Sequence, residues 1–215
     1  MVTIYITAKA RRELLNWLNE QGYSVFTMEP DETFDSPINW HTDIFYCQLG
    51  NTIFSGDSSQ LSTKYPGDVL YNGCSTGKYF IHNTKYTYPQ LLEAAKSTGH
   101  TVIHVPQGYA RCSILPVNED SIITADWGVA KICISAGIND LLIRPGHIQL
   151  TGFNYGFIGG CGGRIGDTVV FHGNLSEHPD GNSIREFIHQ RGLKIKDFPE
   201  FPLTDIGSIL TEGDI

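Results

Sequence analysis

The stretch YARCSILPVNEDSIITADWGVAKICISAGINDLLIRPGHIQLTGF, residues 109–153, decides the fold that we expect for this chain. Apolar residues alternate on both sides of the Asn-Glu-Asp sequence at 118–120, which is typical of two half-buried strands joined by a turn. Asp126 precedes an apolar run with helical spacing and Gly137 follows it, as the two caps of a helix would. Residues 141–143 form another apolar burst. The stretch therefore predicts a hairpin, a helix and a strand, in that order.

Glycines that follow predicted helices recur along the chain at a spacing that suggests repetition. Gly99 and Gly137 are 38 positions apart, and Gly22 precedes Gly99 by 77 positions, so one further unit with a degenerate helix near residues 60–65 fits between them. Gly137 and Gly192 are 55 positions apart because a glycine-rich stretch and a loop intervene. The alternative is coincidence, since glycine follows many helices. A period of roughly 40 residues predicts a repeat architecture.

The two ends of the chain are expected to complete one unit together. Residues 3–7 and 23–27 read as strands, and the tail at 206–210 would supply the hairpin strand that this first unit lacks. The prediction is an α/β fold, a five-unit pseudo-symmetric β/α propeller in which each unit is hairpin, helix and strand and the ring closes between the termini. Residues 1–215 are expected to form a single domain, which is large enough to bury a stable core without disulfides or bound metal.

Composition argues against two classes of partner. The 215 residues carry a formal net charge of −8 and a pI near 5.4, which opposes binding to the phosphates of nucleic acids. No apolar run is long enough to cross a bilayer, and the amino terminus lacks a signal-peptide pattern, so no membrane partner is expected. The cysteines show no C-x-x-C spacing, which indicates reduced thiols in a cytoplasmic protein. They are Cys47, Cys74, Cys112, Cys133 and Cys161.

Two short motifs resemble those of a known superfamily. The sequence HTDIF at residues 41–45 is similar to the His-x-Asp stretch that precedes a strand in arginine deiminases, and RCSIL at 111–115 resembles the strand that carries their nucleophilic cysteine. Five hairpin-helix-strand units in a ring likewise resemble the pentein, or guanidino-group-modifying enzyme, superfamily. It includes arginine and agmatine deiminases, dimethylarginine dimethylaminohydrolases, amidinotransferases and a non-catalytic ribosome anti-association factor.

The resemblance implies a catalytic set. A cysteine thiolate would attack the carbon of a guanidinium group, a histidine would relay protons, and carboxylates would hold the cationic substrate. Cys112, His41 and Asp43 are the candidates, with Cys161 as the alternative nucleophile. Counted back from the second strand of each hairpin, Asp43, Cys112 and the Gly160-Cys161 step occupy nearly equivalent places, so they could face a common centre.

Each candidate also has a structural explanation. Cys112 could be a small buried hydrophobic residue on a strand, and Asp43 could bond local backbone amides. In the glycine-rich stretch around Cys161, the missing side chains let either a ligand or another backbone approach closely. The candidate substrate-binding residues are Arg111, Asp205, Gly159 and Gly160, although Asp205 could equally serve a turn.

Two functions remain open from the sequence. The first is a cysteine-dependent hydrolase or transferase acting on a small guanidino or amidine compound. The second is a non-catalytic pentein that serves as a binding module. No cofactor is expected, and no metal site, because His172 and His178 have no partners at ligand spacing.

Overall fold

The computed structural model describes residues 2–34, 36–56 and 58–213, and the strands in this part of the chain form five small sheets. In sheet order they are β14 (Leu210–Glu212), β1 (Thr3–Thr7) and β2 (Ser24–Met28); β3 (Tyr46–Leu49) and β4 (Thr52–Ser55); β5 (Cys74–Ser75), β6 (Tyr79–His82) and β7 (Thr101–His104); β8 (Ile114–Asn118), β9 (Ser121–Thr124) and β10 (Asn139–Leu142); and β11 (Gly162–Ile165), β12 (Thr168–Phe171) and β13 (Lys194–Lys196). Each three-stranded sheet joins an antiparallel pair to a parallel third strand.

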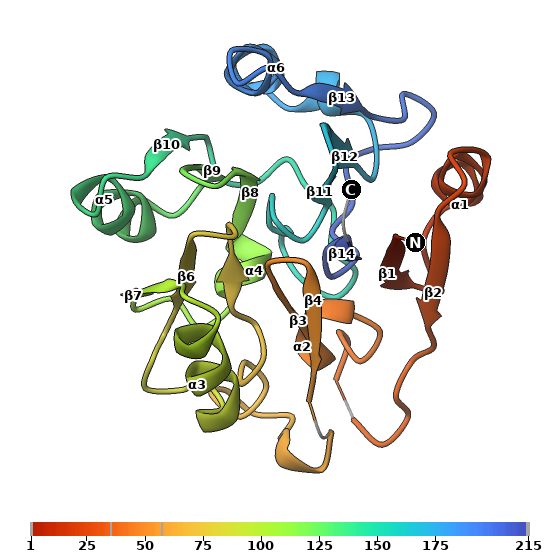
Figure 1. Ribbon diagram of the computed structural model, residues 1–215. Coiled ribbons are helices and arrows are strands. Elements are labelled where there is room, and N and C mark those ends of the chain that lie inside the picture. The colour runs from red at the N-terminus through yellow and green to blue at the C-terminus, as the bar shows by residue number, and fades with distance from the viewer. Residues whose placement is uncertain (1, 35, 57, 214–215) are drawn as a thin grey trace.

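The helices of the repeating units lie at the periphery of the molecule (Figure 1). They are α1 (Arg12–Glu20), α3 (Pro89–Ser97), α5 (Trp127–Ser135) and α6 (Gly181–His189), and each connects the middle strand of its sheet to the parallel third strand. The caps expected for α5 are confirmed, since Asp126 accepts a hydrogen bond from the backbone N–H of Val129 at 3.0 Å. The four glycines that end these helices all have the left-handed backbone that favours glycine, with φ of 73–84°: Gly22, Gly99, Gly137 and Gly192.

The second unit departs from the others. Its sheet has only β3 and β4, and the helix expected near residues 60–65 is replaced by one 3-10 turn, Ser58–Gln60, within the described residues. Pro66 lies just beyond, and a proline has no N–H to continue a helical hydrogen-bond pattern. The backbone instead makes tight turns, in which the N–H of Gly67 donates to the carbonyl of Lys64.

The two ends of the chain pair as expected, but the tail strand lies further along. β14 pairs antiparallel with β1, with Thr3 opposite Glu212 and Tyr5 opposite Leu210. The strand expected at residues 206–210 is therefore wrong in its bounds. Residues 206–209 instead hydrogen-bond to the backbone of Gly160 and Gly162, which brings this segment to the middle of the molecule.

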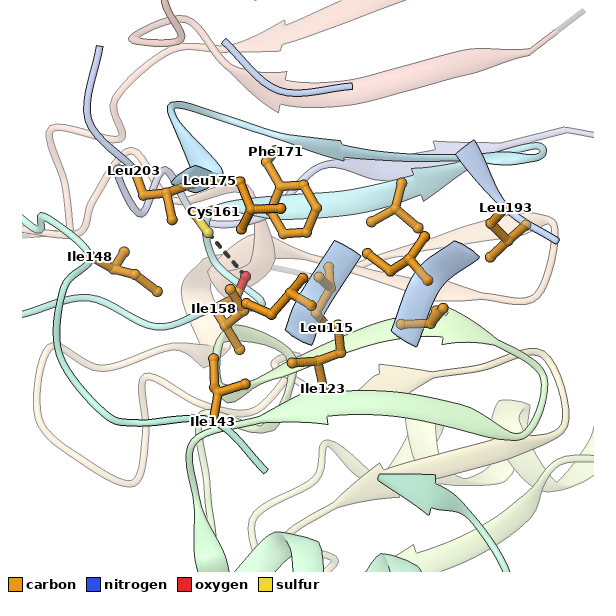
Figure 2. Packing of buried hydrophobic residues seen from close by; sticks show 14 residues of the cluster. Leu115, Ile123, Ile143, Ile148, Ile158, Cys161, Phe171, Leu175, Leu193 and Leu203 are labelled. Carbon is orange, nitrogen blue, oxygen red and sulfur yellow. Dashed lines mark hydrogen bonds between the residues drawn. The ribbon is translucent and has the colours of Figure 1, made fainter. Parts of the chain in front are cut away.

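The first strands of the hairpins contact one another in succession: β3 with β5, β5 with β8, β8 with β11, β11 with β14, and β14 with β3. Apolar clusters fill the space between these strands and the outer helices, as Figure 2 shows for the cluster that includes Leu115, Ile123 and Phe171. Two single-turn helices, α2 (Thr42–Phe45) and α4 (Ala110–Ser113), precede β3 and β8. None of the helices in the described residues has the length and apolar character needed to cross a bilayer.

Candidate active site

Two single-turn helices bring an acid and a thiol together. Asp43 lies in α2 and Cys112 in α4, each two or three residues before the strand that follows. The thiol of Cys112 donates to Asp43 Oδ2, with 3.1 Å between Sγ and the oxygen, and both residues are buried. The strand expected at 111–115 begins only at Ile114, because the chain first makes a helical turn in which the N–H of Ser113 donates to the carbonyl of Tyr109.

Asn72 holds this pair, and sequence reasoning missed it. Its side-chain Nδ2 donates to Cys112 Sγ at 3.3 Å and to the carbonyl of Asp43 at 3.0 Å, while its Oδ1 accepts the backbone N–H groups of Arg111 and Cys112. All of its hydrogen-bonding capacity thus goes to positioning the acid and the thiol. Asn72 stands two residues before β5, as Cys112 stands two before β8, so the repeat could have revealed it.

His41 completes the cluster of potentially reactive groups. It is 2% exposed, and its Nδ1 lies 3.8 Å from Asp205 Oδ1, whereas its Nε2 is buried and has no hydrogen-bond partner among the residues that the structure describes. One ligand-type atom from each of His41, Asp43 and Cys112 lies within 4.8 Å of the others. The sequence motif and the cysteine therefore meet although 69 positions separate Asp43 from Cys112.

Asp205 is bound to the backbone as well as facing the histidine. Its two carboxylate oxygens accept the N–H groups of Phe157 at 2.9 Å and Gly207 at 3.0 Å. Burial raises the pKa of this carboxyl group, and the neighbouring His41 opposes that shift. Asp205 thus holds a turn through the N–H of Gly207 and also faces His41, while its role in binding a substrate stays a prediction.

Ser208 supports Asp43 from the segment before β14. The residue is fully buried and has a left-handed backbone with φ of 73°, which is strained for a residue with a Cβ. Its hydroxyl donates to Asp43 Oδ2 in a short hydrogen bond and lies 3.1 Å from the carbonyl of Gly159. Asp43 Oδ2 therefore accepts from both Ser208 and Cys112, while Asp43 Oδ1 is buried and has no partner within the described residues.

The electrostatics of this cluster keep the thiol protonated at rest. Burial raises the pKa of Cys112 well above its ordinary value, and the carboxylates of Asp43 and Asp205 raise it further. The hydrogen bond from Asn72 acts in the opposite direction because it stabilises the thiolate. A cation placed beside these carboxylates would lower the pKa of the thiol.

Arg111 hydrogen-bonds to the protein backbone. Its guanidinium donates to the carbonyls of Gly159 at 2.8 Å, Ile114 at 3.3 Å, Gly162 at 2.9 Å and Ile209 at 3.2 Å. These four contacts tie together the segments that begin β8, β11 and β14. The contacts that the structure shows for this side chain are therefore structural, where the sequence suggested a substrate-binding role.

At the two candidate glycines, the missing side chain leaves space that other parts of the protein occupy. A Cβ on Gly159 would lie 2.1 Å from the carbonyl oxygen of Arg111, and a Cβ on Gly160 would lie 2.1 Å from Asp205 Oδ1. Of the two explanations for this stretch, close approach of another part of the chain is the one that the structure shows. Gly160 leaves space for the Asp205 carboxylate, so it shapes the site indirectly.

Cys161 lies in an apolar environment, shown in Figure 2. It packs with residues such as Ile158 and Phe171, and its thiol donates to the carbonyl of Ile158 at 3.2 Å. Burial raises its pKa. The structure does not include it in the cluster of His41, Asp43 and Cys112. All five cysteines are free, as the sequence predicted.

Comparisons with known proteins agree with the architecture. Residues 53–210 match the model of a family of unknown function, DUF6873. The chain belongs to this family. No curated protein matches the sequence. Among solved structures, the chain is similar to a dimethylarginine dimethylaminohydrolase variant in an adduct with S-methyl-L-thiocitrulline, with 11% identity, a TM-score of 0.58 and 98% of each chain covered. This likeness shows that the DUF6873 chain has the pentein fold that the sequence suggested.

The cluster also has the donor types of a metal site, which the sequence did not predict. Thiolate, imidazole and carboxylate are all ligands of zinc, and His41 Nε2 is available while Nδ1 faces Asp205. His172, considered from the sequence, has another role, since its Nε2 accepts the backbone N–H of Arg11. Burial lowers the pKa of His172 to about 4, so it stays neutral.

A cavity of about 630 Å³ lies elsewhere, among the hairpin turns at residues 48–51, 75–77, 116–119 and 164–167. Arg111 lines it, but Cys112, His41 and Asp43 do not. Because Cys112 is only 4% exposed, a ligand reaches it only if neighbouring segments move.

Proposed function

We propose that this protein is a pentein hydrolase or transferase that modifies a small guanidino or amidine compound through Cys112. The observation that carries the proposal is the buried cluster in which the reactive atoms of His41, Asp43 and Cys112 lie within 4.8 Å of one another. A strongly perturbed thiol beside a histidine and carboxylates is typical of a reactive site. The likeness to a solved hydrolase supports the proposal through the fold alone.

The chemistry follows from the charges of the cluster. A guanidinium held by the Asp43 and Asp205 carboxylates lowers the pKa of Cys112, and His41 accepts the thiol proton. The thiolate forms a bond to the central carbon of the substrate. That carbon then loses its bond to an amine nitrogen, which leaves with a proton donated by His41. Water deprotonated by His41 finally cleaves the C–S bond, which releases a urea-type product and the thiol; in a transferase, an amine would replace the water.

The architecture behind the site is part of the same proposal. The closed succession of contacts among β3, β5, β8, β11 and β14 supports a five-unit pseudo-symmetric propeller formed by one domain, residues 1–215. Asp43, Asn72, Cys112 and Ser208 then come from four different units, all near the axis. Five free thiols support a reducing compartment such as the cytoplasm.

Labelling with chloroacetamidine, an amidine that carries an alkylating carbon, tests the proposal. We expect mass spectrometry to find one adduct on Cys112, formed faster than with iodoacetamide because the amidinium is held beside Asp43 and Asp205. Asp43→Asn should remove this preference, and Cys161→Ala should retain it. Equal rates for the two reagents, with no amine release from any guanidino compound offered, would refute the enzyme and favour the non-catalytic binding module.

A further inference from the structure

A third buried carboxylate lies next to the site. Asp68 is 5% exposed, and its Oδ2 accepts a short hydrogen bond from the hydroxyl of Tyr109. Its other oxygen, Oδ1, is buried and has no hydrogen-bond partner among the described residues. None of the ion pairs in that part of the chain includes Asp68. An unpaired buried carboxylate is costly, so a cation that it could bind is the natural complement.

The geometry connects Asp68 to the nucleophile. Tyr109 is the residue before α4 and Cys112 lies three positions later, a spacing that places two side chains on the same face of a helical turn. Charge on Cys112 also raises the pKa of Tyr109, after burial and the Asp68 hydrogen bond, which agrees with their proximity. The Asp68 carboxylate is thus separated from the reactive cluster by one phenol side chain.

Aromatic side chains extend from Tyr109 toward the surface. The ring of Tyr65 lies 6.1 Å from that of Tyr109, and Tyr65 is 50% exposed. Because the reactive thiol is itself buried, a substrate that enters beside Tyr65 would meet Tyr109 and Asp68 before Cys112. The aromatic side chains can stack against a planar or cationic group as it passes.

The charges around this route favour a substrate with two positive groups. Asp43, Asp205 and Asp68 supply three buried carboxylates, while the guanidinium of Arg111 is occupied by four backbone carbonyls. Four of the five N–H groups of Arg111 are therefore occupied, and none of these four can bind a carboxylate of the substrate. A compound with one guanidinium and a second amine would satisfy both acidic positions, whereas an amino acid would bring an unpaired negative charge.

We infer that Asp68 is a second cation subsite, and that the substrate is a guanidino or amidino compound that ends in a second amine and carries no carboxylate. This inference rests on the proposed function. The guanidinium lies between Asp43 and Asp205, and the distal ammonium binds Asp68 Oδ1 beside Tyr109. Asp68 thereby determines specificity without touching the reacting carbon.

Calorimetric binding to the Cys112→Ser protein tests the inference without turnover. The probes are 4-guanidinobutylamine, which has two positive groups, butylguanidine, which has one, and arginine, which adds a carboxylate. At low salt we expect 4-guanidinobutylamine to bind at least about 10-fold more tightly than the other two probes. Asp68→Asn should remove this advantage and leave the affinity for butylguanidine within about twofold.

Asp120→Asn, in the exposed turn between β8 and β9, is the matched control and should change neither affinity. Equal binding of the three probes to the protein with Asp68 intact overturns the inference, even if Asp68→Asn fails to fold. An equal loss for all probes in a folded Asp68→Asn protein does so too, and both results leave the proposed function standing. Selective binding that depends on Asp68, without turnover by the unmodified protein, confirms the subsite and refutes the enzyme.

Discussion

Cys112 and Cys161 both lie just before the first strand of a hairpin, two residues before β8 and one residue before β11, and they differ in the polar groups around them. Around Cys112 lie Asp43, Asn72 and, within the same cluster, His41. Cys161 packs among aliphatic and aromatic side chains, and its thiol donates to a carbonyl three residues away. The Asp205 carboxylate raises the pKa of both thiols, so it does not distinguish them. Burial alone therefore does not identify a reactive thiol; what matters is which polar groups are buried with it.

The largest expected effect is on turnover, where serine variants of Cys112 and Cys161 should differ, and the same two variants should also differ in stability. Cys112→Ser should lower turnover at least about 10³-fold, because the nucleophile is lost, yet leave the free energy of unfolding within about 0.5 kcal/mol, because a hydroxyl can also donate to Asp43. Cys161→Ser should retain turnover and lower the free energy of unfolding by about 1–2 kcal/mol, because a polar group enters an apolar cluster.

Steady-state kinetics and urea unfolding of the two variants give both quantities. If Cys112→Ser and Cys161→Ser lost activity to the same extent, or lost stability to the same extent, the distinction between the two thiols would be wrong.

A smaller effect should follow from removing the amide that supports the thiolate. Asn72→Ala deletes the donor to Cys112 Sγ, so we expect the pKa of the thiol to rise. The thiolate absorbance near 240 nm, taken as the difference from Cys112→Ser, follows this titration. At fixed pH, turnover should fall, because a smaller fraction of the thiol is ionised.

Asn72→Ala also frees the backbone N–H of Cys112, so circular dichroism must show an intact fold. An unchanged thiol titration in the folded variant would remove Asn72 from the mechanism.

The smallest effect concerns Asp140, a buried carboxylate that lies away from the candidate site. Both oxygens of Asp140 in β10 are buried and have no hydrogen-bond partner in the described part of the chain, and burial raises its pKa from 3.8 to about 7. Because the folded protein holds this proton more tightly than the unfolded chain, the contribution to stability is present below about pH 4 and is lost as the pH rises toward 7.

Asp140→Asn should therefore unfold with a free energy about 1 kcal/mol higher than the parent at pH 8, and with little difference at pH 4. Thermal melts at the two pH values measure this. A constant difference between them would show that Asp140 does not titrate in this range.

Much of the fold was predictable because it repeats. The glycines that end the helices need a left-handed backbone, so they mark the end of each helix in the sequence. The first unit lacked one hairpin strand, which predicted that the tail of the chain would pair with β1. The second unit was less predictable because Pro66 and the turns around it replace a helix. The tail strand was displaced because residues 206–209 bond to the central backbone instead.

The clustering of the candidate residues was predictable where a motif or a repeat position pointed to it. His41, Asp43 and Cys112 came from the motif and from counting back along the hairpins, and the structure brings them together. Sequence reasoning could not choose between Cys112 and Cys161, because residues distant in the chain determine each environment. It missed Ser208 for the same reason, since Asp43, its partner, is 165 positions away.

The guanidinium of Arg111 also has a consequence for the order in which the protein can fold during synthesis. Its four carbonyl partners extend from Ile114 to Ile209, a residue near the carboxyl end of the chain. Ser208, which holds Asp43, emerges from the ribosome at the same late moment. The nascent chain therefore cannot complete the hydrogen bonds of Arg111, or bring the Ser208 hydroxyl to Asp43, until residues 208 and 209 have been synthesised.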